Sequence, residues 1–174
     1  MHQHRAADTS PATPRPAVII RAAEWQRDLE AMARLSLEQQ GTRARSLSEL
    51  DEQAFGPDAV ATVATLDKAR ANQLIGFRYG RKWCGDVWTG ELFLVHDRWR
   101  DLGIGTMISD VYFEALRARG AKAVITGNSS LYPPVKGALD PVTSQWRRPR
   151  ELYLRQGYQI VSETDETTVY LKKF

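Results

Sequence analysis

The chain has 174 residues, of which 43% are hydrophobic and 26% are charged, and its formal net charge is +3. These values are ordinary for a globular domain that can bury a core, and so weak a positive charge favours anionic ligands only slightly. The single cysteine, Cys84, excludes an internal disulfide, and three histidines, two of them among the first four residues, exclude a credible zinc site. No apolar run is long enough to span a membrane, so we expect no membrane association.

The N-terminal segment 1–16 is rich in Ala, Thr, Pro and His and lacks the apolar block of a signal peptide. This composition predicts a disordered leader. We expect residues 17–174 to form one domain of a cytoplasmic protein, because no internal repeat or second domain is visible in the sequence.

Hydrophobic periodicity predicts both helices and strands in the first half of the chain. A β-branched run predicts a strand at 17–21, and apolar positions three and four apart predict a helix at 24–40 that ends at Gly41. A second, short helix over 48–55 is expected to use Ser48 as its N-cap and to end before Pro57. Three strands are expected to follow, at 59–66, 73–83 and 87–95.

From Ile104 the pattern changes to that of an amphipathic helix, which Gly120 ends. A buried strand at 121–126, an irregular segment at 127–145, a helix at 147–156 and two strands at 158–163 and 167–172 are expected next. This order predicts an α/β protein with a mixed sheet of about six to seven strands and helices on both faces. The strands before and after the amphipathic helix should be parallel and joined by a right-handed crossover.

The most informative segment is Arg100-Asp101-Leu102-Gly103-Ile104-Gly105, between an apolar strand and the start of this helix. A helix begins with backbone N–H groups that have no intrahelical partner, and the helix dipole adds positive charge there, so this order of elements can bind an anion. No Gly-Lys-Ser/Thr follows, and Ile108 stands where a dinucleotide fingerprint has Gly or Ala. A plain helix-capping turn is the alternative interpretation.

Two motifs make the chain resemble the GNAT superfamily of acyl-CoA-dependent N-acyltransferases. The first is the loop just described, which resembles the family's Gln/Arg-x-x-Gly-x-Gly/Ala loop. The second is Leu152-Tyr153-Leu154-Arg155-Gln156-Gly157-Tyr158, which resembles the late Phe/Leu-Tyr-x-x-x-Gly-Phe/Tyr segment. The order of elements matches the family from Val18 to Phe174. The resemblance implies a GNAT-like fold that uses acetyl-CoA as co-substrate, without a metal.

The resemblance also implies where coenzyme A binds. The loop amides would hold its pyrophosphate, and the end of the preceding strand would present main-chain groups to the pantetheine arm, with the Val95 N–H as an oxyanion site. An asparagine after the strand at 121–126 matches a residue that touches the arm. The coenzyme-binding residues implied in this way are Leu94, Val95, Arg100, Asp101, Leu102, Gly103, Ile104, Gly105, Thr106 and Asn128.

Two residues match catalytic positions of the family. Tyr153 would protonate the departing thiolate, a transfer that the reference pKa values of a phenol and a thiol allow when the two groups are adjacent. Glu91 would bind the incoming amine or accept its proton through water. The structural alternatives are a core tyrosine and a solvent-facing strand residue. Asp86 and His96 are weaker candidates.

The chain departs from the family pattern at three places. Asp97 replaces a common proline and Asp101 a common glycine, and a carboxylate there is tolerated if it faces solvent or pairs with Arg98 or Arg100. The segment after Asn128 is longer than such folds require, and loops of this kind usually have a function. We expect some of its residues to line the acceptor pocket, with Tyr132 and Trp146 as the candidates. The third departure is a basic cluster of Arg147, Arg148 and Arg150.

The sequence therefore predicts an N-acetyltransferase in which a primary amine attacks the bound thioester directly. A covalent enzyme intermediate is not expected, because no histidine is placed to activate Cys84. Two alternatives stay open: a non-catalytic module that binds acyl-CoA or a partner, and an enzyme that modifies nucleic acid or aminoacyl-tRNA through the arginine cluster. The acceptor, a small molecule or a peptide, and pairing into a homodimer through the final strands are not decided by the sequence.

Overall fold

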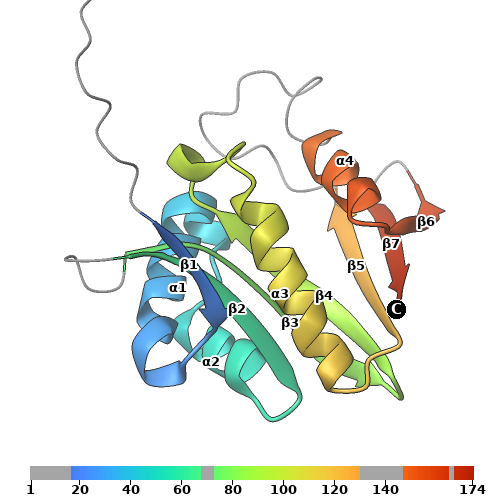
Figure 1. Ribbon diagram of the computed structural model, residues 1–174, viewed down its shortest axis with the longest axis horizontal. Coiled ribbons are helices and arrows are strands. Elements are labelled where there is room, and N and C mark those ends of the chain that lie inside the picture. Colours follow the sequence, from blue (N-terminus) through green and yellow to red (C-terminus); the bar gives the residue numbers. More distant parts are fainter. Residues whose placement is uncertain (1–16, 68–72, 130–146, 165–166) are drawn as a thin grey trace, which may run out of the picture.

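A computed structural model describes residues 17–67, 73–129, 147–164 and 167–174. Its centre is a seven-stranded sheet in the order β1-β2-β3-β4-β5-β7-β6 (Figure 1). The strands are β1 (Val18–Ala22), β2 (Ala59–Leu66), β3 (Leu74–Cys84), β4 (Val87–Val95), β5 (Ala123–Ser129), β6 (Gln159–Glu163) and β7 (Thr167–Lys173). The α-helices are α1 (Trp25–Gln40), α2 (Leu47–Phe55), α3 (Ile104–Ala118) and α4 (Arg147–Arg155).

The sheet confirms the expected mixed α/β class. The strands β4 and β5 are the one parallel pair of neighbours among the described strands, and α3 connects them, as the crossover rule predicts. The other neighbouring pairs are antiparallel. No helix in the described part of the chain is long and apolar enough to cross a membrane.

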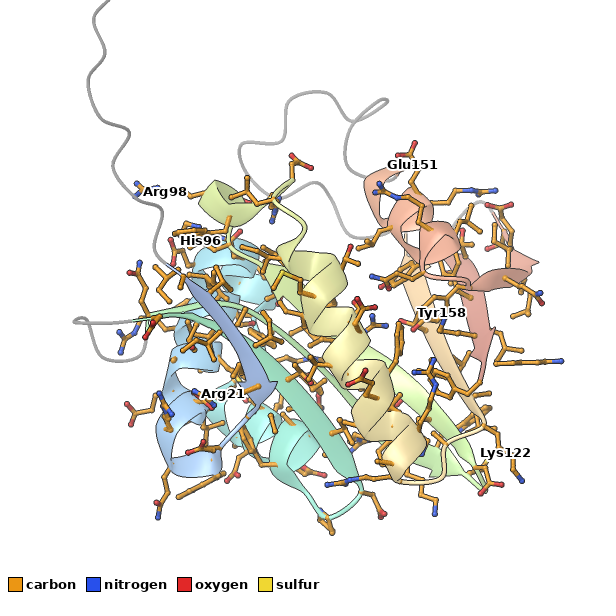
Figure 2. The ribbon with its side chains drawn as sticks, in the orientation of Figure 1. Arg21, His96, Arg98, Lys122, Glu151 and Tyr158 are labelled. Atoms are coloured by element: carbon orange, nitrogen blue, oxygen red, sulfur yellow. The ribbon has the colours of Figure 1, made fainter. Side chains whose placement is uncertain are left out.

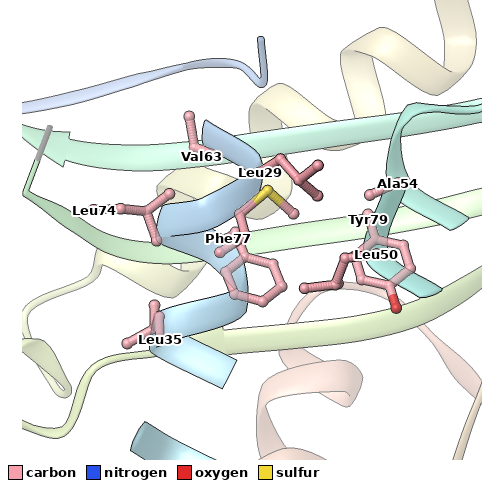
Figure 3. Packing of buried hydrophobic residues seen from close by; sticks show 9 residues of the cluster. Leu29, Leu35, Leu50, Ala54, Val63, Leu74, Phe77 and Tyr79 are labelled. Carbon is pink, nitrogen blue, oxygen red and sulfur yellow. The ribbon is translucent and has the colours of Figure 1, made fainter. Parts of the chain in front are cut away.

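The helices cover both faces of the sheet. On one face, α1 and α2 bury Met32 and Leu50 against Phe77 and Tyr79 of β3 (Figure 3). On the other face, α3 packs against β2, β3 and β4, and its Tyr112 is fully buried. Tyr153 of α4 packs into the same cluster, with Val124 of β5 and Tyr170 of β7. Side chains alternate between the faces of a strand, which explains how β3 serves both layers. The central strands are therefore held in place from both sides.

The start of α2 differs from the expectation. Its N-cap is Ser46, not Ser48: the Ser46 hydroxyl accepts a hydrogen bond from the Glu49 N–H at 3.2 Å, and the Glu49 carboxylate accepts one from the Ser46 N–H at 2.8 Å. This is a capping box, which needs a Glu three residues after the cap. Of the two serines, only Ser46 has a Glu three residues later, so the helix begins earlier than predicted.

A buried ion pair joins β1 to α1. The Asp28 side chain is 1% exposed and accepts hydrogen bonds from both terminal nitrogens of Arg21, at 2.6 and 2.8 Å. The same carboxylate accepts the Glu24 N–H at 2.8 Å and so satisfies an amide at the start of α1. The hydrogen bonds to Asp28 raise the pKa of Arg21. One carboxylate thus fixes the angle at which the chain enters the helix.

Replacing Asp28 with alanine should lower the free energy of unfolding by about 3 kcal/mol, because it leaves a charged partner and an amide unsatisfied in a buried place. Chemical denaturation followed by circular dichroism measures this change. The matched control is Glu24→Ala, since the exposed Glu24 carboxylate lies 3.9 Å from Arg21 and should cost less than about 1 kcal/mol. Equal losses in the two variants would contradict the role assigned to Asp28.

Candidate functional site

The strands β4 and β5 are paired over only part of their length. Their register joins Val87–Gly90 to Ala123–Thr126 and ends there, although β4 continues to Val95 and β5 to Ser129. Figure 1 shows the two strands running apart toward the end at which α3 begins. We call this opening the β4–β5 gap. It leaves main-chain groups of both strands without a strand partner on that side.

A β-bulge in β4 lies where the gap begins. Tyr79 of β3 is paired with Leu92, and the next residue, Gly80, is paired with Gly90, so Glu91 is an extra residue on β4. A bulge bends its strand and increases the local twist. Gly80 makes room for this bend, because a Cβ there would lie 1.9 Å from the Thr89 carbonyl oxygen. The bend turns β4 away from β5.

The register also decides which main-chain groups of β4 face the gap. The His96 N–H donates to the Ile75 carbonyl at 2.8 Å, and the Val95 carbonyl accepts the Arg100 Nε–H at 3.1 Å. Since alternate residues of a strand point their N–H and C=O to opposite edges, Phe93 and Val95 face the gap and Leu94 faces β3. The expectation that the main-chain groups of Leu94 face the open side of the strand is therefore wrong. Those of Phe93 face it instead, which follows from the register between β3 and β4.

The loop before α3 presents a row of N–H groups. Asp101 and Gly103 have φ values of 60° and 79°, in the left-handed region. The N–H groups of Leu102 to Thr106 donate to no described residue; the first α3 bond runs from Met107 to the Gly103 carbonyl. Successive amides in such a turn, at the positive end of a helix, form an anion-binding concavity. Asp101 stands at a position where a glycine is common, and its positive φ explains that preference. Asp tolerates this conformation better than most residues.

The two glycines of the loop have different structural reasons. A Cβ on Gly103 would meet nothing within 4 Å, so the positive φ is the constraint there. A Cβ on Gly105 would lie 3.0 Å from the Phe93 ring, so this glycine lets the first turn of α3 approach β4 closely. Ile104, between them, is 3% exposed and contributes its side chain to the core. Its part in the site is limited to its N–H.

Arg100 holds the loop in place. It bonds the Val95 carbonyl, donates to Gln39 of α1 at 3.2 Å, and pairs with Asp97 at 2.7 Å. The Asp97 carboxylate is therefore neutralised by Arg100, as expected for a carboxylate next to an anion-binding loop. His96, a weaker candidate, lies 3.2 Å from Glu38 of α1 and accepts the Arg98 N–H on Nδ1. These contacts attach the loop to the last turns of α1.

Tyr153 lies on α4, on the α3 side of the sheet. Its ring is edge-on to Tyr158 with centroids 5.2 Å apart, and tilted against Tyr170 at 4.9 Å. Within the described residues its hydroxyl makes no hydrogen bond, which leaves it able to act on a ligand. Burial raises the pKa of Tyr158 to about 12, although Arg78 opposes the rise. Tyr158 therefore stays protonated at neutral pH.

Glu91 lies on the other side of the sheet. Its carboxylate accepts the Thr89 hydroxyl at 2.5 Å, and it is half-buried. Nearby, the Tyr79 hydroxyl donates to Gln53 of α2 at 3.0 Å, and burial, together with Glu91, raises the pKa of Tyr79 to about 12. A carboxylate and a phenol thus stand on opposite faces of the sheet, near the point where β4 leaves β5.

The remaining predicted residues are Asp86, Asn128, Tyr132, Trp146 and the arginine cluster. Asp86 pairs with Lys122 at 2.8 Å, at the end of the sheet opposite to His96, so the structure does not bring it to the gap (Figure 2). The backbone of Asn128 pairs with Thr168 of β7. Arg150 forms an ion pair with Glu163. The side chains of Asn128, Arg147 and Arg148, and the whole of Tyr132 and Trp146, lie outside the described residues.

An open groove of about 410 Å³ runs beside the loop, between α3 and the α4–β7 side. It begins at Thr106 and carries basic side chains from three elements. Its lining residues are Thr106, Asp110, Phe113, Glu114, Arg117, Arg155, Gln156 and Lys172. Among the residues that the structure describes, no group of three or more His, Cys, Asp or Glu is placed to hold a metal ion.

Solved structures with this architecture are numerous, and several of them are GNAT acetyltransferases. The chain matches a GNAT-family acetyltransferase from Staphylococcus aureus Mu50 at 11% identity and a TM-score of 0.69, over 90% of this chain and 99% of that one. The chain has the GNAT fold. The ribosomal-protein-S18-alanine N-acetyltransferase from Escherichia coli is similar at 14% identity and a TM-score of 0.66, over 90% and 94%.

A third GNAT structure contains coenzyme A: the PaiA N-acetyltransferase from Thermoplasma acidophilum, at 14% identity and a TM-score of 0.63, over 91% of this chain and 99% of that one. No protein-family model matches the chain, and no curated protein matches its sequence. At such low identities the GNAT comparison establishes the fold. The chemistry has to be argued from the residues of this chain.

Proposed function

We propose that this protein transfers an acyl group, acetyl as the first choice, from coenzyme A to a primary amine by direct attack. The observation that carries the proposal is the row of N–H groups from Leu102 to Thr106 at the mouth of the β4–β5 gap. Such a row suits a diphosphate, and the gap beside it suits an extended arm that bonds main-chain groups. The residues present therefore fit a coenzyme A thioester.

Each residue near the gap has a defined task in this reaction. The thioester, when bound, supplies an activated carbonyl carbon. The N–H of Val95, which faces the gap, donates to the carbonyl oxygen as negative charge develops on it. Glu91 accepts a proton from the amine, directly or through water, because an ammonium group cannot attack. Tyr153 donates its proton to sulfur as the carbon–sulfur bond breaks and the electron pair leaves with it.

Calorimetry tests the binding half of the proposal. Coenzyme A should bind with a dissociation constant in the micromolar range, and at a free concentration 100-fold above it the free energy of unfolding should rise by about 2.7 kcal/mol. Dephospho-coenzyme A should still bind, whereas pantetheine, which has no diphosphate, should bind much more weakly. No heat and no thermal shift with coenzyme A would overturn the proposal.

Thiol release from acetyl-CoA tests the catalytic half. A panel of small amines, amino acids, aminoglycosides and peptides with a free N-terminus should contain at least one acceptor that accelerates release. A protein that binds the coenzyme but releases no thiol with any of these acceptors would instead be a binding module.

A further inference from the structure

Arg78 of β3 is a buried cation. The residue is 1% exposed, and its guanidinium donates to Ser109 of α3 at 2.8 Å, to the Gln156 side-chain oxygen at 3.2 Å and to the Tyr158 hydroxyl at 2.6 Å. All three acceptors are neutral. In the described part of the chain, no carboxylate forms an ion pair with Arg78.

Aromatic rings surround this guanidinium. The ring centroids of Phe93, Tyr112, Phe113 and Tyr158 lie 4.7–5.9 Å from its central carbon. Ring faces attract a cation, but a buried charge without a counter-charge is still costly, and a neutral side chain could fill the same space at lower cost. The arrangement suits a site in which a negative charge forms next to the arginine during function.

The position of Arg78 shows where that charge would form. Gly90 is the last residue of β4 that pairs with β5. A Cβ on Gly90 would lie 3.7 Å from Nη2 of Arg78 and 3.3 Å from Thr126 of β5. The guanidinium therefore sits at the closed end of the β4–β5 gap, on the α3 side. Tyr153 and Tyr158 belong to the cluster on that side, and Tyr158 is labelled in Figure 2.

A second cation enlarges the positive field at this end of the gap. Lys172 of β7 lies 5.0 Å from the Phe113 ring and 5.9 Å from the Tyr158 ring, and it donates to the Gln156 carbonyl. Burial, with smaller contributions from Arg117 and Arg78, lowers the pKa of Lys172, and Asp110 opposes this. On the β4 side, burial raises the pKa of Tyr112, and Glu91 adds to this rise.

We propose that Arg78, acting through Tyr158, stabilises the negative charge that forms on the leaving side when the acyl–sulfur bond breaks. This inference rests on the proposed acyl transfer. The electron pair of the broken bond goes to sulfur, and the proton of Tyr153 follows it, so the charge is shared between sulfur and the Tyr153 oxygen. The Tyr158 oxygen accepts from Arg78, and its own proton is free to turn toward this charge. Arg78 is buried and does not touch the substrate, so it is a positioning residue.

The first experiment needs no acceptor. Calorimetry at pH 8 in two buffers with different ionisation heats measures the protons released when free coenzyme A binds, and desulfo-coenzyme A serves as the reference without a thiol. The wild-type protein should release part of the thiol proton. Arg78→Met should abolish the release while desulfo-coenzyme A still binds within about twofold of the wild type. Unchanged proton release in a folded Arg78→Met protein would overturn the inference.

The second experiment uses kinetics and remains decisive if Arg78→Met fails to fold. Tyr158→Phe should lower kcat about tenfold with KM for acyl-CoA unchanged within about twofold, and Arg78→Lys should retain part of the rate. The matched control is Ser109→Ala, which removes another hydrogen-bond partner of the same guanidinium at a helical position and should keep normal kcat. Equal losses in Tyr158→Phe and Ser109→Ala, or no loss in Tyr158→Phe, would reduce Arg78 to a structural role. Failure of wild-type protein to bind coenzyme A would instead refute the proposed function.

Discussion

Replacing Gly103 with valine should weaken the binding of coenzyme A by about 100-fold. Gly103 has a φ of 79°, a conformation that costs a β-branched residue roughly 1–2 kcal/mol or more, so the backbone of the variant should move out of it. The N–H groups of Leu102 to Thr106 would then no longer converge. Calorimetric titration with coenzyme A measures the loss.

Gly120 provides the matched control for this variant. It lies just beyond the other end of α3, has a φ of 78°, and, like Gly103, would place a Cβ where no atom lies within 4 Å. Gly120→Val should therefore destabilise the fold as much as Gly103→Val and leave the affinity for coenzyme A unchanged. If both variants lose affinity equally, or if Gly103→Val keeps it, the loop is only a helix cap.

Replacing Tyr153 with phenylalanine should lower kcat about 100-fold and leave coenzyme A binding within about twofold of the wild type. The hydroxyl makes no hydrogen bond to a described residue, so its removal leaves no buried group unsatisfied there. The ring, which packs on Tyr158 and Tyr170, is kept. Steady-state kinetics with the best acceptor, together with calorimetry, separates turnover from binding.

Tyr170→Phe is the control for Tyr153→Phe. It makes the same chemical change in the neighbouring ring, which is 1% exposed, but Tyr170 lies in the middle of β7 rather than on α4. Its kcat should stay near that of the wild type. A normal kcat in Tyr153→Phe would remove that tyrosine from the mechanism, and the leaving thiolate would then need another proton donor.

Much of the fold could be predicted from local patterns, because each pattern depends on neighbours along the chain. The amphipathic spacing from Ile104 identified α3, and the two glycines identified the loop before it. The predicted cap at Ser48 is wrong because Ser46, and not Ser48, is followed by a Glu three residues later, and this spacing places the cap. Such errors move the end of an element by a residue or two and leave its place in the fold unchanged.

The site was harder to predict wherever it depends on how strands pair. The main-chain groups of Phe93, and not those of Leu94, face the gap. This follows from the register between β3 and β4, which the sequence does not reveal. Arg78 was missed for the same kind of reason. Its partners Ser109, Gln156 and Tyr158 come from two distant segments, so in the sequence it looks like any charged strand residue.

The bulge at Glu91 has a consequence for the order of kinetic events. Glu91 is near Tyr79 and α2, whereas Tyr153 lies with α3 and α4 on the opposite face. Under the proposed function, amine and coenzyme would approach the reaction centre through separate entrances. Both substrates can then be bound at the same time. A ternary complex is the natural intermediate of such a protein, and the free coenzyme should compete with the acyl donor without displacing the amine.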